Sequence, residues 1–284
     1  MRREEAYDRC RAIARAQARN FYYGFVLLPP AKRAGIYAAY AFSRRADDSV
    51  DEGGSDARRT AAVAALRAEL DACVAGTPPA GDPVLVALAD TIARFGIPRA
   101  HLDALLDGVE MDIAVDRYAD FPALKGYCDR VAGAVGLVSL HIFGFRDPEA
   151  PVHAADLGVA LQIVNIMRDV AEDVARDRIY LPADEMAAHG VTEDDLRAGR
   201  ATPGFRALMA DQGARARTYF RGGERLLPLL DRRSRMCVSM LAGLYQEILH
   251  EIERRDHDVF AGRVALSAPR KLRLLAGRTA GALR

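Results

Sequence analysis

The chain has few cysteines, and they form no recognisable group. Cys10, Cys73, Cys128 and Cys237 lie far apart in the 284 residues, and none belongs to a C-x-x-C pair. This spacing excludes a disulfide framework and the usual zinc patterns, and it favours free thiols in a reducing compartment. Residues 1–20 are charged throughout and do not resemble a secretory signal. We therefore expect a cytoplasmic protein.

Net charge and long apolar runs are lacking as well. The 40 basic residues nearly balance the 39 acidic ones, so no global field attracts nucleic acid and we expect no such partner. No uncharged apolar run reaches the roughly 18–20 residues of a transmembrane helix. A lipid substrate would therefore be met by peripheral contact with a membrane surface. The G-x-G-x-x-G, Walker A and G-x-S-x-G motifs are also absent.

What is present favours helices. Ala, Leu, Arg and Glu are abundant, apolar residues recur at spacings of three and four, and Pro and Gly divide the chain into helix-length pieces. The pattern predicts a single all-α domain over residues 1–284. We expect helices at 3–19, 31–52, 56–75, 83–95, 99–117, 123–143, 152–176, 192–199, 205–221, 231–255 and 268–281.

A first acidic cluster lies at the end of the predicted helix 31–52. Asp47 and Asp51 are four residues apart and share one helix face, with Asp48 beside them. Like charges at this spacing cost roughly a few tenths of a kcal/mol, and they oppose the helix dipole at a C-terminal end. Mg²⁺, which binds one or two carboxylates plus phosphate oxygens, would offset both effects. The alternative is a solvated acidic helix end.

A second acidic cluster forms a polar stripe in the predicted helix 152–176. Asn165, Asp169 and Asp173 follow one another at intervals of four, and Gln162 precedes them on the same side. The other positions of this segment are mostly apolar, which favours a stripe facing an internal cavity. A buried stripe satisfied by another helix is the alternative.

Together the two clusters predict carboxylates that face each other across the core of a helical bundle and share Mg²⁺ ions. Such a site would hold two diphosphates and stabilise a departing diphosphate. Basic side chains near the clusters are candidate phosphate clamps, because guanidinium groups suit bidentate oxygen contacts. They are Lys32, Arg44, Arg45, Arg168, Arg178 and Arg263.

Two glycines interrupt the helical segment 123–143. Gly133 and Gly136 each cost about 1 kcal/mol relative to Ala in a helix. We expect them to make room either for a closely packed helix or for an apolar ligand.

In combination these segments resemble the squalene/phytoene synthase family, the head-to-head trans-prenyl synthases. The resemblance extends over residues 7 to 265 and is carried by segments 20–29, 36–42, 44–51, 127–136, 162–173 and 178–182. Each segment alone is weak evidence for the family, but all of them in this order are specific to it. One departure is the run Ala18-Arg19-Asn20-Phe21, which stands where many relatives have Ser-x-Ser-Phe and so lacks a phosphate-binding hydroxyl.

The resemblance implies an isoprenoid-synthase helical bundle with a central cavity. It assigns binding of Mg²⁺, or Mn²⁺, to Asp47, Asp48, Asp51, Asn165, Asp169 and Asp173. It assigns catalytic roles to Asp47, Asp51, Tyr127, Arg168, Asp169 and Asp173. It assigns substrate contacts to Asn20, Phe21, Phe25, Tyr40, Arg44, Gly133, Gln162, Asn165, Tyr245 and Arg263.

The implied reaction joins two allylic isoprenoid diphosphates head to head through a cyclopropyl diphosphate. Segments 127–133 and 139–144 resemble presqualene diphosphate synthases of hopanoid pathways, which favours two farnesyl diphosphates as substrates. Phytoene synthesis from two geranylgeranyl diphosphates is the alternative, and NADPH is expected only if the product is squalene. An isoprenoid cyclase and a non-catalytic assembly or lipid-binding relative are further alternatives. The glycine-bearing helix argues against the cyclase, and the presence of both acidic clusters argues against the non-catalytic relative.

Overall fold

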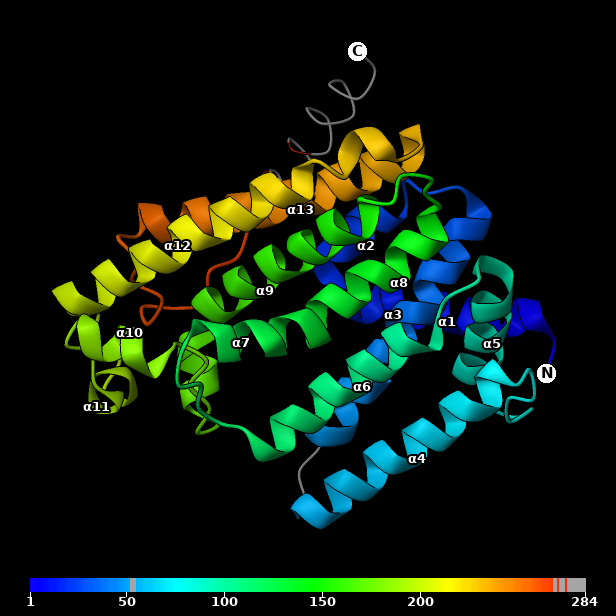
Figure 1. Ribbon diagram of the computed structural model, residues 1–284, viewed down its shortest axis with the longest axis horizontal. Coiled ribbons are helices and arrows are strands. Elements are labelled where there is room, and N and C mark those ends of the chain that lie inside the picture. Colours follow the sequence, from blue (N-terminus) through cyan, green and yellow to red (C-terminus); the bar gives the residue numbers. More distant parts are fainter. Residues whose placement is uncertain (52–54, 268–269, 271–273, 275–284) are drawn as a thin grey trace.

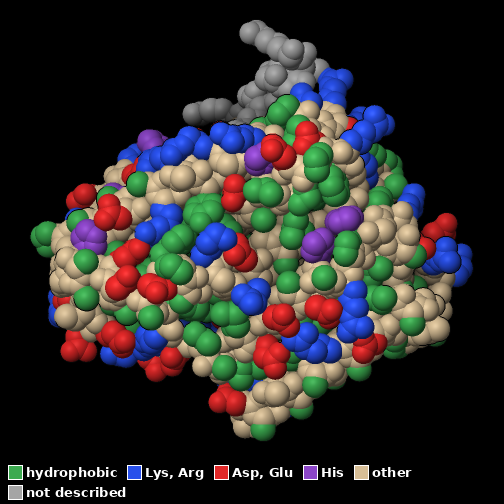
Figure 2. All heavy atoms as spheres, in the orientation of Figure 1, with side chains coloured by type: hydrophobic (Ala, Val, Ile, Leu, Met, Phe, Trp, Pro, Cys, Tyr) green, Lys and Arg blue, Asp and Glu red, His purple; other side chains and the backbone are tan. Residues whose placement is uncertain are grey.

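The computed structural model describes residues 1–51, 55–267, 270 and 274, and this part of the chain forms a helical bundle (Figure 1). Within these ranges there is no β-strand, and the only β-type pairing is one parallel bridge between Arg117 and Ile179. The predicted all-α class is therefore confirmed. Acidic and basic side chains are interspersed over most of the face shown in Figure 2, in keeping with a formal net charge of +1.

The helices follow one another with short connections. In chain order they are α1 (Arg3–Gln17), α2 (Arg19–Phe25), α3 (Pro30–Asp51), α4 (Asp56–Val74), α5 (Pro83–Phe95), α6 (Arg99–Ala114), α7 (Phe121–Cys128), the π-helical turn η1 (Asp129–Gly133), α8 (Ala134–Phe143), α9 (Ala150–Val174), α10 (Ala183–Ala188), α11 (Glu193–Arg197), α12 (Pro203–Glu224), the 3₁₀ turn η2 (Leu227–Leu229) and α13 (Arg232–Arg254).

Helix α9 is the central element of the bundle. It packs against α8 and η1 on one side and against α12 and α13 on the other (Figure 1). Of the described helices, α9 alone is long and apolar enough to cross a membrane by length and composition, and 61% of its apolar window is buried inside the bundle. Its apolar character therefore matches its place in the core.

The segment expected as one helix over 123–143 contains a π-helical turn instead. Residues Asp129–Gly133 form this turn between α7 and α8. A Cβ atom on Gly158 of α9 would lie 2.4 Å from the carbonyl oxygen of Ala132, and one on Gly136 would lie 2.6 Å from that of Ala154. The backbones of α9 and of the η1–α8 segment therefore touch. Such inserted turns often occur at functional sites.

Two helices lie where the sequence predicted irregular chain. Segment α2 is rich in aromatic residues and contains Gly24, which weakens its local helix signal. Tertiary packing stabilises it, because a Cβ on Gly24 would lie only 2.8 Å from the Leu241 side chain of α13. The short helix α10 begins directly after Pro182. Most of the predicted helix 268–281 lies outside the described residues.

Replacing Gly158 by Ala should destabilise the protein. The added methyl group meets backbone atoms of Ala132 and Gly133 that cannot move without displacing η1, so we expect a loss of about 1–3 kcal/mol in the free energy of unfolding, measured by chemical denaturation. The matched control is Gly126→Ala in α7, where the nearest atom is the flexible Arg130 guanidinium at 3.4 Å. Equal losses in both variants would contradict the close approach.

Candidate active site

A cavity of about 290 Å³ lies in the bundle between α3, α6, α8, α9 and α13. Its wall is mostly apolar and includes the aromatic rings of Phe21, Phe25 and Tyr40. Its polar members include Asp47 from the first acidic cluster and Gln162 and Asn165 from the second, together with Ser43 and Ser139. The two distant segments therefore meet at one apolar cavity, and the second contributes its amides to the wall, whereas its carboxylates Asp169 and Asp173 are not among the lining residues.

Asp169 lies in a cluster of arginines just beyond the cavity. Arg168 donates from Nε to Asp169 at 2.8 Å and makes a second, shorter contact through Nη2. Arg263 pairs with Asp169 at 3.1 Å and with Glu172 at 3.2 Å. Tyr245 is buried beside Arg168, and burial raises the pKa of its hydroxyl. Positive charge thus already surrounds the carboxylate of Asp169.

Arg263 reaches this cluster because the chain turns back after α13. Phe260 packs on Phe205 with ring centroids 5.0 Å apart, and Val264 and Leu266 are buried. These contacts hold residues 255–267 against α12, so that Arg263 reaches Asp169 on α9. We refer to residues 255–267 as the return segment.

The first acidic cluster is also neutralised by arginine. Arg44 pairs with Asp48 one turn further along α3. Asp47 lines the cavity, whereas the side chain of Asp51, like that of Asn20, lies outside the described part of the chain. Arg44 therefore already has a carboxylate partner on its own helix.

Two of the candidate phosphate clamps were predicted wrongly. Arg45 points away from the cavity and pairs with Glu69 at 2.8 Å and with Asp82 at 2.5 Å. Lys32 lies at the opposite end of α3 from the acidic cluster. Arg45 follows Arg44 by one residue, or about 100° of helix rotation, and the pattern of charges did not show which of the two faces the core.

The donor set fits a hard divalent cation. The Asn165 side chain donates from Nδ2 to the Gln162 oxygen at 3.3 Å, while its own Oδ1 is buried without a hydrogen-bond partner. Carboxylate and amide oxygens are the ligands that Mg²⁺ prefers. Among the described side chains no three Asp, Glu, His or Cys residues form a ready-made metal cluster. Mg²⁺ commonly binds only one or two carboxylates and takes its remaining ligands from phosphate and water.

Asp173 continues the stripe into a smaller cavity behind the arginine cluster. Arg178 and Tyr180 line this space with it. Burial, and next the neighbouring charge of Asp169, raise the pKa of Asp173 to about 7. The carboxyl group is therefore held in a place that disfavours its ionised form unless a cation is near.

A hydrogen-bonded group around Asp112 was not predicted from the sequence. Tyr127 donates to Asp112 at 3.1 Å and Tyr180 donates to it at 2.8 Å, while Arg178 donates to its backbone carbonyl at 2.9 Å. Tyr118 stacks on the ring of Tyr180 and lies tilted against that of Tyr127. The family resemblance includes segment 178–182, which contains Tyr180. No sequence motif, however, identified Asp112 as the hydrogen-bond partner of Tyr180.

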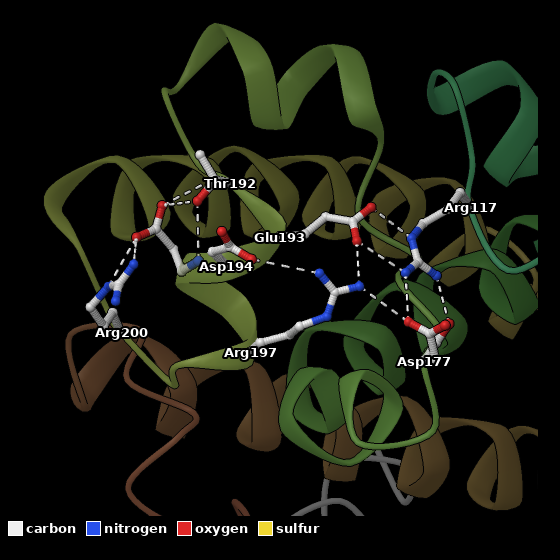
Figure 3. Close-up of polar contacts among 8 residues, drawn as sticks. Arg117, Asp177, Thr192, Glu193, Asp194, Arg197 and Arg200 are labelled. Carbon is white, nitrogen blue, oxygen red and sulfur yellow. Dashed lines mark hydrogen bonds and ion pairs between the residues drawn. The ribbon is translucent and has the colours of Figure 1, made fainter.

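The chain after α9 is held by surface ion pairs, shown in Figure 3. Arg117 pairs with Glu193 at 2.8 Å and with Asp177 at 2.9 Å, and Arg197 pairs with the same two carboxylates. Asp177 adopts a left-handed conformation with φ 57°. The network fixes the turn that carries Arg178 and Tyr180 toward Asp112.

Gly133 does not line the large cavity as expected. Its neighbours Val131, Ala132 and Gly136 do so. Gly133 instead lies against α9, where a Cβ on Gly158 would meet its backbone nitrogen at 2.8 Å. The family resemblance assigned Gly133 to the substrate, whereas the structure brings Gly136 to the cavity wall.

A family model described as squalene/phytoene synthase matches residues 14–270 of this chain. The chain belongs to the squalene/phytoene synthase family. The 15-cis-phytoene synthase of Synechococcus elongatus is 40% identical over 282 residues, with 94% of this chain and 90% of that protein covered. A phytoene synthase of Mycobacterium tuberculosis is 40% identical over 283 residues, with 99% and 92% covered. The chain spans 66% of the length of the chloroplastic phytoene synthase of an Oncidium hybrid.

Solved structures share the fold over nearly the whole chain. A dehydrosqualene synthase crystallised with a ligand superposes with a TM-score of 0.91 at 30% identity, covering 98% of this chain and 97% of that one. A squalene synthase from Alicyclobacillus acidocaldarius gives a TM-score of 0.84 at 32% identity, covering 90% and 96%. The isoprenoid-synthase bundle expected for this family member is thereby confirmed.

The raised pKa of Asp173 predicts a pH-dependent stability in metal-free protein. An unfolded Asp titrates near about 3.9, so between about pH 4 and 7 the folded state binds more protons than the unfolded state. The free energy of unfolding should therefore fall as the pH rises through this window. Asp173→Asn removes the titration. In calorimetry with a chelator, we expect the melting temperature of the wild type to fall relative to that of Asp173→Asn between pH 5 and pH 8.

The exposed carboxylate of Asp8 on α1 provides the control. Asp8→Asn should keep the pH profile of the wild type. Parallel profiles for the wild type and Asp173→Asn would show that Asp173 does not carry the effect.

Proposed function

We propose that this protein couples two molecules of geranylgeranyl diphosphate head to head and forms phytoene. The observation that carries the proposal is the meeting of Asp47, Gln162 and Asn165 at one apolar cavity, in a chain that belongs to the squalene/phytoene synthase family. An apolar cavity with polar groups at one end suits a ligand with a charged head and a hydrocarbon tail.

The choice of substrate departs from the farnesyl diphosphate favoured by the sequence. Relatives at 37–40% identity are named phytoene synthases, which supports the alternative stated there. Segments 127–133 and 139–144 take part in the helix packing around η1. This packing does not determine how deep the cavity is, so these segments do not decide the length of the substrate. Since phytoene formation consumes no reductant, the proposal requires no NADPH.

The chain offers a set of oxygen ligands for magnesium beside the cavity. The residues that would hold the ions are Asp47, Asp48, Asp51, Asn165, Asp169 and Asp173. When bound, Mg²⁺ supplies positive charge that stabilises a departing diphosphate. The buried, unpartnered Oδ1 of Asn165 supports this assignment.

Arg168 and Arg263, which pair with Asp169, would also bind the phosphate groups of the substrate. Arg168 and Arg263 both pair with Asp169, and their guanidinium groups suit bidentate contacts with phosphate oxygens. A diphosphate arriving beside Asp169 would compete for these donors. Arg263 is the more exposed of the two, at 44% against 12%, so it is the one free to turn toward the substrate.

The rest of the cavity protects and orients the hydrocarbon. The rings of Phe21, Phe25 and Tyr40 present aromatic faces that stabilise cationic centres. The apolar wall excludes the water that would quench an allylic cation. Burial raises the pKa of Tyr127 well above its ordinary value, so its hydroxyl stays protonated at neutral pH and holds its proton toward Asp112.

We also propose a cytoplasmic location with peripheral contact to a membrane. The support is chemical, because the product is a hydrocarbon with no charged group and would partition into a bilayer.

Purified protein with Mg²⁺ should convert geranylgeranyl diphosphate to phytoene, identified by mass spectrometry of the extracted products. Farnesyl diphosphate offered alone should give less product per unit time. Exclusive turnover of farnesyl diphosphate would reject the proposed substrate, and turnover of neither would reject the coupling reaction itself.

Asp47→Asn and Asp169→Asn should each reduce turnover by at least about 100-fold, a typical loss when one preorganised electrostatic contact to a transition state is removed. Circular dichroism should show both variants folded. The control is Asp107→Asn on α6, where the carboxylate pairs with Arg67 at 2.7 Å outside the cavity. Wild-type turnover in both site variants would exclude these carboxylates from catalysis.

A further inference from the structure

Lys32 holds three helix ends together at the end of the bundle away from the acidic clusters. It projects from the first turn of α3, and its Nζ donates to the carbonyl oxygen of Phe143, the last residue of α8. The same Nζ lies 2.5 Å from Asp231 and 3.3 Å from Ser234 at the start of α13. We call this set of contacts, made by Lys32 with Phe143, Asp231 and Ser234, the Lys32 latch.

The latch lies at the apolar end of the cavity. Lys32 and Asp47 are 15 positions apart on α3, which corresponds to ~22 Å along the helix. Each helix that the latch joins contributes a nearby apolar residue to the cavity wall, namely Ile36 of α3, Phe143 of α8 and Val238 of α13. A hydrocarbon tail whose diphosphate is bound near Asp47 would therefore extend toward the latch.

The latch stabilises two helix termini at once. The Phe143 carbonyl belongs to the last turn of α8, whose carbonyl groups have no partner within the helix. Asp231 is the N-cap of α13 and accepts hydrogen bonds from the backbone nitrogens of Arg233 and Ser234. Ser234 is fully buried and donates to Asp231 at 2.7 Å. Removal of the Lys32 charge would loosen α8 from α13 while leaving the cap of α13 intact.

The latch is charged at working pH and only partly shielded from water. Burial would raise the pKa of Asp231, but hydrogen bonds from Lys32 and Ser234 lower it to about 2. The side chains of Lys32 and Asp231 are 24% and 46% exposed, and a partly exposed ion pair contributes little to stability. Loss of the pair should therefore cost little folding stability and should act mainly on how far α8 and α13 separate.

The cavity must enlarge to accept its substrates. Its volume of about 290 Å³ is at the low end of ligand sites, which span roughly 300–1,000 Å³, and two prenyl chains need more room. At the apolar end Lys32 links the three helix termini by polar contacts, beside the apolar packing of α3 on Ile142 of α8.

We propose that the Lys32 latch is a specificity-determining element, which closes the apolar end of the cavity and limits the length of the prenyl tail. This inference rests on the proposed function. It names Lys32 and Asp231 as positioning residues, which set how far α8 and α13 separate, and it gives neither of them contact with the reacting carbons.

The test compares prenyl diphosphates that differ only in tail length. Lys32→Met keeps the length of the side-chain stem and removes the charge, and Asp231→Asn removes the ion pair while retaining a good N-cap residue. The value of kcat/KM is measured with the twenty-carbon and the twenty-five-carbon diphosphate. In both variants the ratio for the longer substrate to the shorter one should rise about tenfold, within the range by which an apolar pocket discriminates size.

The matched control is Arg33→Met in the same turn of α3. Arg33 donates to the Val26 carbonyl at 3.2 Å and takes no part in the latch, so its ratio should equal that of the wild type. An unchanged ratio in folded Lys32→Met and Asp231→Asn, or an equal rise in Arg33→Met, would overturn the inference. Failure of the wild type to turn over any prenyl diphosphate would instead reject the proposed function.

Discussion

The contact between two backbones in the centre of the bundle determines where the site lies. Gly158 on α9 faces the Ala132 carbonyl of the π turn, and Gly136 on α8 faces the Ala154 carbonyl of α9. Because neither glycine has a Cβ, α9 lies as near to its neighbour as main-chain atoms permit. The same turn directs Val131 and Ala132 into the cavity. One close approach thus sets both the position of the polar stripe on α9 and the shape of the apolar wall opposite Asp47.

Arginine neutralises acidic side chains on both sides of the cavity. Arg44 pairs with Asp48, and Arg168 and Arg263 pair with Asp169. These pairs let carboxylates lie beside an apolar hollow without leaving several like charges close together. If a cation and a diphosphate bind as proposed, the carboxylates would exchange arginine for the metal and the guanidinium groups would exchange carboxylate for the phosphate. The ligands replace internal ion pairs, so little new charge is buried.

The sequence predicted well which segments are helical and which residues share a helix face. It predicted poorly which side chains contact one another across the bundle. The i, i+3 spacing correctly placed Asn165 beside Gln162, and the two segments meet at the cavity through Asp47 and these two amides. Helical periodicity could not distinguish Arg44 from Arg45, nor foresee the π turn. The family resemblance assigned Gly133 to the substrate, whereas Gly136 lines the cavity. Asp112 was missed because its tyrosine partners are 15 and 68 positions away, and no local pattern records contacts of that range.

The return segment has a consequence for the order in which the protein is made. Arg263 reaches Asp169 only after residues 255–267 have folded back, with Phe260 packed on Phe205 of α12. During synthesis the N-terminal parts of a chain emerge first, so α9 leaves the ribosome with its carboxylates still lacking that guanidinium. The nascent protein can therefore assemble its core before its charged centre is complete.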